Sequence, residues 1–338
     1  MKNENVSFET QFGLSFLRIM ATFSVILIHV SASLVTKYGQ ISFFDWNVAN
    51  FFDSISRYSV PMFFMISGAL LLGRDYELID FLKKRLGKIL PPFIIWSTIY
   101  SLLNRYLFGE DSFNLVKVVK DVFYGSKYHL WFIFALLGVY LMVPILRKWI
   151  KNASNKEIQY VLIIWLLTVT LTIPNLKIYF PKINLVYFSG YIGYFILGYY
   201  LSMFKFKIVV PISFIILGLT ITFLGTCHFT VLNSEPYYYF YEHLSLNTFL
   251  VSSGLFMLFN KAHSSNKNIH LFVERLNQLC FGIYLMHPLV LDEFNLIGFN
   301  VYTASPVISI LMLAFVCFFV CSVITFCFKQ LRYGYLIV

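Results

Sequence analysis

Long runs of apolar residues restrict what this chain can fold into more than any other feature. About 20 apolar residues, at 1.5 Å rise per residue, cross the roughly 30 Å hydrocarbon core of a bilayer. Charged residues make up 12% of the 338 residues, about half the share found in ordinary soluble domains. The sequence therefore predicts an all-α polytopic membrane protein with about ten transmembrane helices, near residues 13–35, 49–73, 89–107, 129–146, 158–174, 187–203, 208–226, 245–260, 277–298 and 303–328.

The basic residues test this count independently, because cytoplasmic loops collect Lys and Arg. If the N-terminus is cytoplasmic, 17 of the 26 basic residues fall on the cytoplasmic side. The alternation predicts that both termini are cytoplasmic, and it assigns the net charge of +10 to topology rather than to nucleic-acid binding. The cytoplasmic set is Lys2, Arg74, Lys83, Lys84, Arg85, Lys88, Arg147, Lys148, Lys151, Lys156, Lys205, Lys207, Lys261, Lys267, Arg275, Lys329 and Arg332. The outer set is Lys37, Arg105, Lys117, Lys120, Lys127, Lys177 and Lys182.

The connections between these segments leave no room for a second domain. The longest, at 108–128, 227–245 and 261–276, are too short to fold alone. We interpret residues 1–338 as a single integral-membrane domain and expect no soluble extracytoplasmic domain. The five cysteines form no CxxC pair and have no nearby histidine at ligand spacing, so we interpret them as packing residues and expect no metal site.

Two ionisable residues lie inside the first apolar segment. Arg18 and His29 are eleven residues apart, which is three helical turns plus roughly 20°, so they share one face about 16 Å apart along the axis. An Arg within a span costs at least about 2.5 kcal/mol, which favours a position facing the protein interior. The alternatives are that Arg18 reaches back to the interface and that His29 is a hydrogen-bonded core residue.

The second segment begins with a polar stretch that contains Asp53 and Arg57. Because these residues are four apart, they can pair with each other on one helix face, or they can line a cavity open to the outside. Pro61 removes one backbone hydrogen bond, and the pair Ser67 and Gly68 permits close approach of a neighbouring helix. We therefore expect a kink in this helix where it packs against another helix.

Three further regions combine polar and aromatic residues. The stretch 83–88 is predicted as a basic inner loop that anchors the chain at the membrane surface and can also bind a polyphosphorylated ligand. The aromatic run 237–241 suits either a lipid-headgroup belt or a platform that stacks on sugars. The third region consists of two pairs of residues: His129 with Trp131 at the start of the fourth apolar segment, and Tyr284 with His287, before Pro288, in the ninth.

The usual signatures of soluble enzymes are absent from the sequence, including GxSxG, a Walker loop and HExxH. Taken together, the polar residues within the apolar segments give a sequence that resembles the membrane-bound acyltransferase 3 family of bacterial acyl carriers and O-acetyltransferases. The resemblance rests on five blocks in order: Leu17-Arg18 with His29, Arg57 with residues 60–68, residues 84–92, residues 129–132, and residues 281–287.

The resemblance implies transfer of an acyl group, which we expect to be acetyl, from cytoplasmic acyl-CoA to a hydroxyl of a cell-envelope glycan or its lipid-linked precursor, in the bacterial cytoplasmic membrane. It implies that His29 and Arg18 are catalytic, with His29 as the base. No permanently bound cofactor is expected, and acyl-CoA is a co-substrate. The implied partners are membrane lipid, the glycan acceptor and a protein of envelope biosynthesis, without nucleic acid. The implied substrate-binding residues are Lys84, Arg85, Arg57, His129, Trp131, Tyr284 and His287.

Two other classes of protein fit parts of this pattern. A transporter or flippase of a lipid-linked sugar also carries intramembrane Arg and His, although such proteins often show internal repeats and the sequence has none. The second class is a structural membrane subunit without catalytic activity. Such a subunit would not need Arg and His together on one inward-facing side of a helix. Acyl transfer is the function that the sequence favours.

Overall fold

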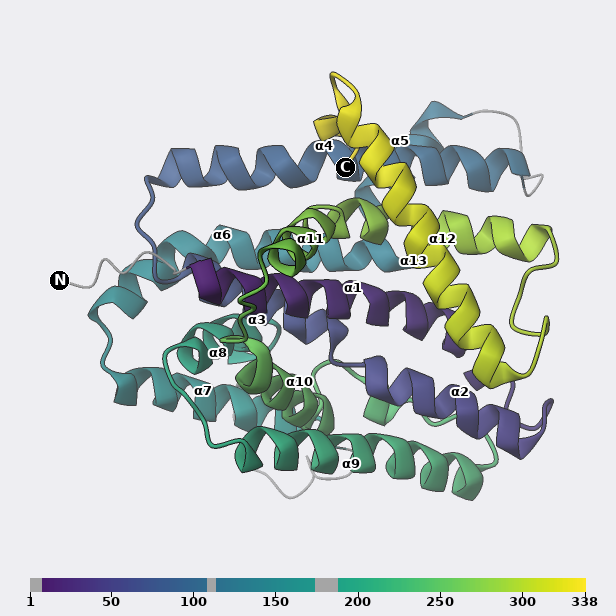
Figure 1. Ribbon diagram of the computed structural model, residues 1–338, viewed down its shortest axis with the longest axis horizontal. Coiled ribbons are helices and arrows are strands. Elements are labelled where there is room, and N and C mark those ends of the chain that lie inside the picture. Colours follow the sequence, from purple (N-terminus) through teal and green to yellow (C-terminus); the bar gives the residue numbers. More distant parts are fainter. Residues whose placement is uncertain (1–7, 108–113, 174–187) are drawn as a thin grey trace.

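The structure is a computed structural model that describes residues 8–107, 114–173 and 188–338. Within these ranges every regular element is a helix (Figure 1), which confirms the predicted all-α fold. Lys2, Lys177 and Lys182, which the topology prediction used, lie outside the described residues. The α-helices are α1 (Phe8–Val35), α2 (Phe43–Ser56), α3 (Ser59–Leu71), α4 (Leu78–Leu107), α5 (Leu115–Tyr124), α6 (Trp131–Asn152), α7 (Asn155–Thr170), α8 (Ile192–Ser202), α9 (Val209–Asn233), α10 (Leu246–Phe259), α11 (Lys267–Asn277), α12 (Cys280–Leu296) and α13 (Pro306–Gln330), and the 3-10 helices are η1 (Tyr128–Leu130), η4 (Tyr239–Tyr241) and η5 (Gly334–Leu336).

Each predicted apolar segment coincides with a helix, and the second coincides with the pair α2 and α3. The helices of the other predicted segments have 11–17 residues, so the count of ten crossings remains a prediction. Among the described residues, five helical stretches are long and apolar enough to cross a membrane: Phe12–Val35, Leu78–Asn104, Tyr128–Asn152, Val209–Asn233 and Pro306–Gln330.

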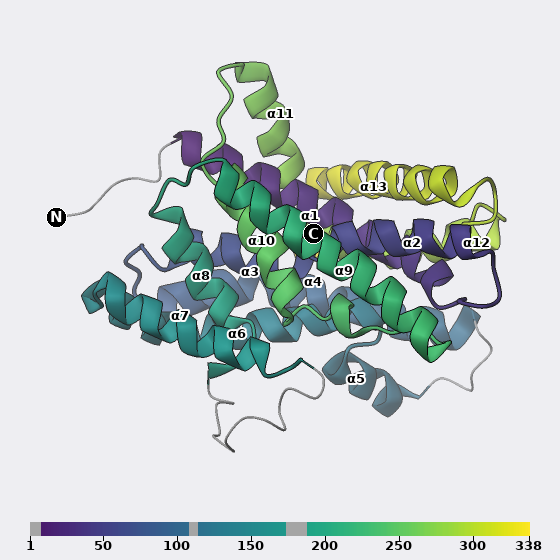
Figure 2. The same ribbon diagram turned by 90° about the horizontal axis from the view of Figure 1, so that it is seen from below.

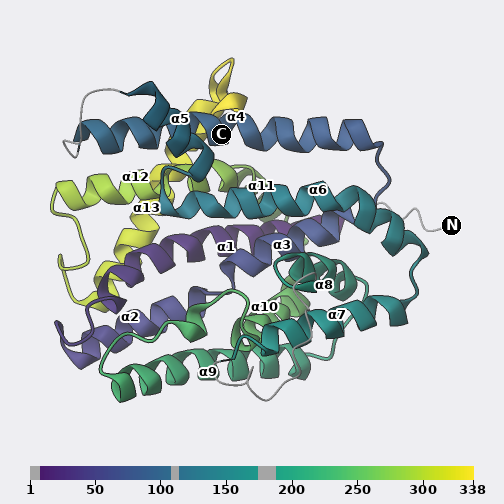
Figure 3. The ribbon, with the colours of Figure 1, turned by 180° about the vertical axis from the view of Figure 1, so that it is seen from behind.

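The connections of the bundle lie at two opposite ends. Figures 1 and 3 show the α3–α4 and α6–α7 connections at the end where α1 starts, and the α1–α2 and α12–α13 connections at the other end. Two of the basic turns that the sequence assigns to the cytoplasm therefore share an end with the start of α1.

The basic stretch that was predicted as a loop is helical, so that prediction is wrong. Residues 83–88 form early turns of α4, which starts at Leu78 and continues through Pro91 and Pro92. Leu, Lys and Arg are good helix formers, and Asp80 in the first turn complements the positive end of the helix dipole. Two other predicted connections also contain helices, α5 and α11, both amphipathic.

The predicted kink in the second segment is a complete break between α2 and α3. The break falls at Arg57 and Tyr58, and Pro61 lies in the first turn of α3. Because proline has no N–H, the carbonyl of Arg57, four residues earlier, loses its helical partner. The interruption thus follows from Pro61 and leaves Arg57 at the end of a helix inside the bundle.

Glycines bring α3 and α8 into backbone contact. A Cβ on Gly68 would lie 1.7 Å from the carbonyl oxygen of Phe195, and one on Gly198 would lie 2.1 Å from that of Met65. Small residues allow membrane helices to approach this closely. The close approach predicted at Gly68 is confirmed, and α8 is the partner helix.

The bundle is organised around α1, which packs against α2, α3, α10, α11, α12 and α13. Figure 2 shows α9 crossing α10 on one side of this centre. The crossing is close because a Cβ on Gly218 would lie 2.7 Å from the carbonyl oxygen of Asn247. Polar residues on α1 are therefore surrounded by protein from several directions.

The α3–α8 contact gives a stability prediction. Gly68→Ala forces the two backbones apart and should lower the free energy of unfolding by about 1–3 kcal/mol. The matched control is Gly138→Ala on α6, where a Cβ meets no atom within 4 Å and the change should be neutral or slightly stabilising. Thermal unfolding of the detergent-solubilised protein measures both. Equal midpoints for the two variants would show that the contact contributes little.

Candidate active site

Three histidines from separate parts of the chain meet inside the bundle. The rings of His29 on α1 and His287 on α12 stack, with centroids 5.2 Å apart and planes 22° apart. His129, in η1, meets His287 edge-on at 5.2 Å. The sequence marked all three as candidates, and the structure brings them together in one cluster.

A proline in α12 explains how His287 is held. Pro288 has no N–H, so the carbonyl of Tyr284 loses its helical partner. The Nδ1 of His287 is 2.7 Å from that oxygen, and because a carbonyl only accepts, Nδ1 carries the proton. In the neutral ring Nε2 then holds a free lone pair. This atom is buried and has no hydrogen-bond partner among the described residues.

The same turn of α12 also fixes η1. The carbonyl oxygen of Leu285 accepts a hydrogen bond from the Tyr100 hydroxyl at 2.8 Å and one from Nε2 of His129 at 3.3 Å. The hydroxyl of Tyr284 donates to the carbonyl oxygen of His129. Backbone carbonyls of α12 and the Tyr284 side chain thus set the position of His129 and of the start of α6.

His29 is the member of the cluster that borders a cavity. It is half-buried, whereas His287 and His129 are 0% and 3% exposed. The cavity, of about 250 Å³, has a mixed lining that includes Ser33 and Tyr302. The ring of Tyr128 lies 4.8 Å from that of His29 on another side. A substrate can therefore reach His29 more directly than the other two histidines.

Arg57 pairs with Asp53 and also lines a cavity, whereas Asp53 is not part of that lining. The Nε of Arg57 donates to the fully buried carboxylate of Asp53, so the predicted pair is confirmed. A second N–H donates to the carbonyl oxygen of Tyr241 at 3.3 Å, and the guanidinium lies 4.2 Å from the centre of the Tyr241 ring. Arg57 also lines a second cavity of about 520 Å³.

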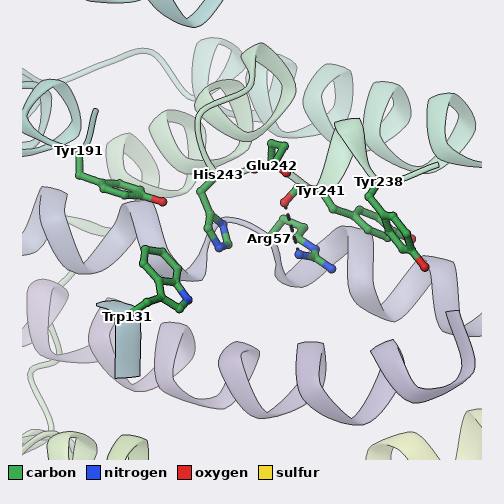
Figure 4. A pocket seen from close by; sticks show the side chains of 7 residues that line it. All are labelled: Arg57, Trp131, Tyr191, Tyr238, Tyr241, Glu242 and His243. Atoms are coloured by element: carbon green, nitrogen blue, oxygen red, sulfur yellow. Dashed lines mark hydrogen bonds between the residues drawn. The ribbon is translucent and has the colours of Figure 1, made fainter. Parts of the chain in front are cut away.

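Figure 4 shows this second cavity, which we call the Arg57 cavity. The cavity lies next to the His129 end of the histidine cluster, because its lining residue Trp131 follows His129 by two residues and stacks on His243. Sequence reasoning marked Arg57 and Trp131 but missed Tyr191, Glu242 and His243; the aromatic run 237–241 was the nearest signal. The lining residues are Arg57, Trp131, Tyr191, Tyr238, Tyr241, Glu242 and His243.

Arg18 lies at the corner between α11 and α12. Its guanidinium donates to the side-chain oxygen of Asn277 at 2.7 Å, which confirms that it faces protein. Both Arg18 and His29 thus lie against the α11–α12 segment, Arg18 near its corner and His29 beside His287. One face of α1 carries both residues, as the eleven-residue spacing predicts.

The cations predicted to bind phosphate, Arg18, Lys84 and Arg85, do not form one cluster as the three histidines do. Lys84 is exposed, and the Arg85 guanidinium lies 6.0 Å from the ring of Phe81 on its own helix. In the part of the chain that the structure describes, no hydrogen bond or ion pair joins either residue to Arg18. Lys329 on α13 donates to the carbonyl oxygen of Gln278 at the α11–α12 corner and interacts electrostatically with Lys88.

The five cysteines are free thiols, and Cys280, Cys317 and Cys321 are buried, consistent with packing. Among the described residues, no group of three or more His, Cys, Asp and Glu side chains is placed to hold a metal ion.

A helical bundle with several membrane-length helices and an internal histidine cluster between two cavities is the architecture of a membrane protein with a buried polar site. The chain belongs to the acyltransferase 3 family, described as an acyltransferase domain, which matches residues 11–328. It is 22% identical to probable poly-β-1,6-N-acetyl-D-glucosamine export proteins of Staphylococcus aureus strains MSSA476 and MW2, over 83% of this chain and 82% of theirs. It is 31% identical to an amino-acid racemase of Enterococcus faecalis over 40% of this chain and 20% of the racemase. No solved structure matches.

Proposed function

We propose that the protein transfers an acyl group from cytoplasmic acyl-CoA to a hydroxyl of a cell-envelope glycan, or of its lipid-linked precursor, in the cytoplasmic membrane of a bacterium. The observation that carries this proposal is the cluster of three histidines beside two cavities. Family membership supports acyl transfer, and the relatives named for polysaccharide export support a glycan as the acceptor.

Acetyl is the acyl group that we propose. Within the family the sequence resembles the enterobacterial common antigen O-acetyltransferase, and less closely the succinyltransferase of intercellular adhesin synthesis. Acetyl-CoA is then the co-substrate, with no permanently bound cofactor. The other partners of the reaction are membrane lipid, the glycan and a protein of envelope biosynthesis.

His29 is the general base in this proposal. The oxygen of the sugar hydroxyl attacks the thioester carbonyl carbon while a ring nitrogen of His29 takes the hydroxyl proton. The C–S bond then breaks, and the departing CoA thiolate receives that proton from His29, so the base is regenerated. A positioned base of this kind contributes roughly 10² to 10⁴ in rate.

His287 and His129 support His29 in this proposal. His287 stacks on His29 while its own Nδ1–H is held by the Tyr284 carbonyl, so the ring that supports His29 is fixed. His129 and Tyr284 close the other side of the cluster. These residues shape the position at which the thioester and the hydroxyl meet.

Arg18, Lys84 and Arg85 are proposed to bind the phosphates of the donor, because charge-assisted bonds from Arg and Lys suit phosphate. Arg18 and His29 are about 16 Å apart along α1, by helix geometry. This separation is comparable to an extended pantetheine arm. The nucleotide can therefore remain near the α11–α12 corner while the thioester reaches His29.

The second candidate function is movement of a lipid-linked sugar or polysaccharide across the membrane. It is favoured by the staphylococcal relatives, which are named as probable export proteins, and by intramembrane Arg and His, which also mark transport paths. Incubating the purified protein with labelled acetyl-CoA separates the two, because only the acyltransferase hydrolyses the thioester or transfers the label.

The first prediction concerns the base. His29→Ala should lower turnover of labelled acetyl-CoA by roughly 10² to 10⁴ while acetyl-CoA affinity changes little, since a lost base removes stabilisation of the transition state. The control is His263→Ala, an exposed histidine in the connection between α10 and α11, which should leave turnover unchanged. If His29→Ala keeps more than about a tenth of the turnover, His29 is a packing residue and His287 becomes the leading candidate.

The second prediction concerns the donor. Arg18→Ala and Arg85→Ala should each weaken CoA affinity roughly tenfold or more, because a hydrogen bond to a charged group contributes about 1.5–3 kcal/mol. Arg18→Lys should restore part of the loss, since the planar fork is not replaced. The exposed Lys120→Ala on α5 is the control. Calorimetric titration with CoA measures all four, and unchanged affinity in both Ala variants would mean that the donor binds elsewhere.

The third prediction concerns topology, for which we propose ten crossings with both termini cytoplasmic. In a variant whose exposed Cys327 is replaced by Ser, Gln40→Cys and Ala304→Cys should react with a membrane-impermeant maleimide in intact cells. Asp75→Cys and Ser154→Cys should react only after lysis, because their connections carry the cytoplasmic basic residues. All four positions lie in connections between helices. Labelling of Asp75→Cys in intact cells would reject this orientation.

A further inference from the structure

The Arg57 cavity is assembled from four separate parts of the chain. Arg57 comes from the break between α2 and α3, Trp131 from the start of α6, and Tyr191 from the residue before α8, while the remaining lining residues belong to 238–243. Its volume of about 520 Å³ lies within the range of sites that bind small molecules. The reaction proposed for His29 does not by itself assign an occupant to it.

Aromatic rings form two walls of this cavity. On one side Trp131 stacks on His243, with centroids 5.7 Å and planes 22° apart, and lies 5.7 Å from Tyr191. On the other side are Tyr238 and Tyr241, and Figure 4 shows Arg57 and His243 between the two sides. A pyranose ring has apolar C–H faces that pack on aromatic rings and a polar rim of hydroxyls. Walls of aromatic rings with polar groups between them match this shape.

The polar groups of the cavity can both donate and accept. The guanidinium of Arg57 has five N–H donors, and hydrogen bonds to Asp53 and to the Tyr241 carbonyl occupy two of them. Glu242 offers carboxylate oxygens that accept. The imidazole of His243 interacts with the Arg57 backbone, and its buried Nδ1 has no hydrogen-bond partner among the described residues. Sugar hydroxyls, which donate and accept, can satisfy all of these groups.

The charge of the cavity disfavours an anionic ligand. Asp53 neutralises Arg57 inside the protein, so Arg57 supplies donors without net positive charge. Glu242 is then the remaining formally charged side chain among the lining residues, and it is negative and exposed. A uronate or a phosphate-bearing sugar placed here would meet a like charge, with no unpaired cation among the described lining residues to offset it.

We infer that the Arg57 cavity binds one sugar unit of the acceptor and selects an uncharged sugar over an anionic one. The inference rests on the proposed function, because it places the glycan acceptor beside the base. Trp131, which lines the cavity and stacks on His243, follows His129 of the histidine cluster by two residues. A sugar held between the aromatic walls therefore presents a hydroxyl toward the histidine cluster.

Binding of two matched disaccharides to the full-length protein in lipid nanodiscs tests this inference. The probes are diacetylchitobiose, which is uncharged, and the hyaluronan disaccharide, in which a glucuronate replaces one amino sugar. Calorimetry should show at least about fivefold tighter binding of diacetylchitobiose. Trp131→Ala should weaken that binding roughly tenfold or more, as for an aromatic anchor that the ligand covers, and Trp131→Phe should restore part of it. Tyr160→Ala, an exposed aromatic on α7, is the matched control.

The variant Glu242→Lys tests the selectivity for uncharged sugars. Glu242 is exposed, so Glu242→Lys should not endanger folding. This change should tighten the hyaluronan disaccharide at least about fivefold relative to diacetylchitobiose, because the charge that repels the carboxylate is reversed. An unchanged ratio between the two probes would overturn the charge selectivity.

Acetyl-CoA turnover, measured in parallel, separates failure of this inference from failure of the proposed function. Sugar binding that depends on Trp131 in a protein without turnover supports the cavity as a glycan site and rejects the acyltransferase. Turnover in a protein whose sugar affinity is the same in wild type and Trp131→Ala overturns the inference alone. Absence of binding of both disaccharides also overturns it.

Discussion

The candidate site depends on a backbone hydrogen bond that α12 cannot make. Pro288 leaves the Tyr284 carbonyl without its helical donor, and in a dry interior an unpaired carbonyl costs several kcal/mol. His287 supplies the missing donor from its own side chain, and the next carbonyl, of Leu285, accepts from Tyr100 and His129. Satisfying the backbone therefore places two histidines, and η1 with them, at one depth in the bundle beside His29.

A second proline has a similar effect on the other side of the site. Pro61 frees the carbonyl of Arg57 and ends α2, and the His243 ring interacts with the Arg57 backbone. Removing Asp53 alone would leave Arg57 charged and unpaired, a change that typically costs 3–5 kcal/mol at a buried site. The break, the ion pair and the larger cavity are thus linked, because the interruption that places Arg57 in the interior also opens the space that it lines.

Sequence patterns anticipated the helical fold, the interior position of Arg18 and the pairing of Asp53 with Arg57, because each follows from the cost of exposing polar groups to lipid. They did not reveal that residues 83–88 are helical, since a basic stretch beside a membrane span suits a loop and a helix equally. Nor did they show that His129 and His287 meet His29. That meeting depends on how α12 packs against α1 and on the hydrogen bonds that hold η1 to α12, and no local periodicity contains this information. His243 was missed because it follows an aromatic run that was judged by its aromatic residues alone.

His29 borders the smaller cavity and the Arg57 cavity lies near His129. This arrangement bears on a problem that any acyl transfer to a sugar must solve. Water is a competing acceptor for the thioester, and a base that activates a hydroxyl can also activate water. The smaller cavity brings polar groups such as Ser33 and Tyr302 close to His29, so water can be hydrogen-bonded there. In the larger cavity a sugar ring can cover the aromatic faces while its hydroxyls replace water on Arg57 and Glu242. Preference for the sugar over water would then come from binding in the larger cavity rather than from the chemistry of the base, which is the same for both acceptors.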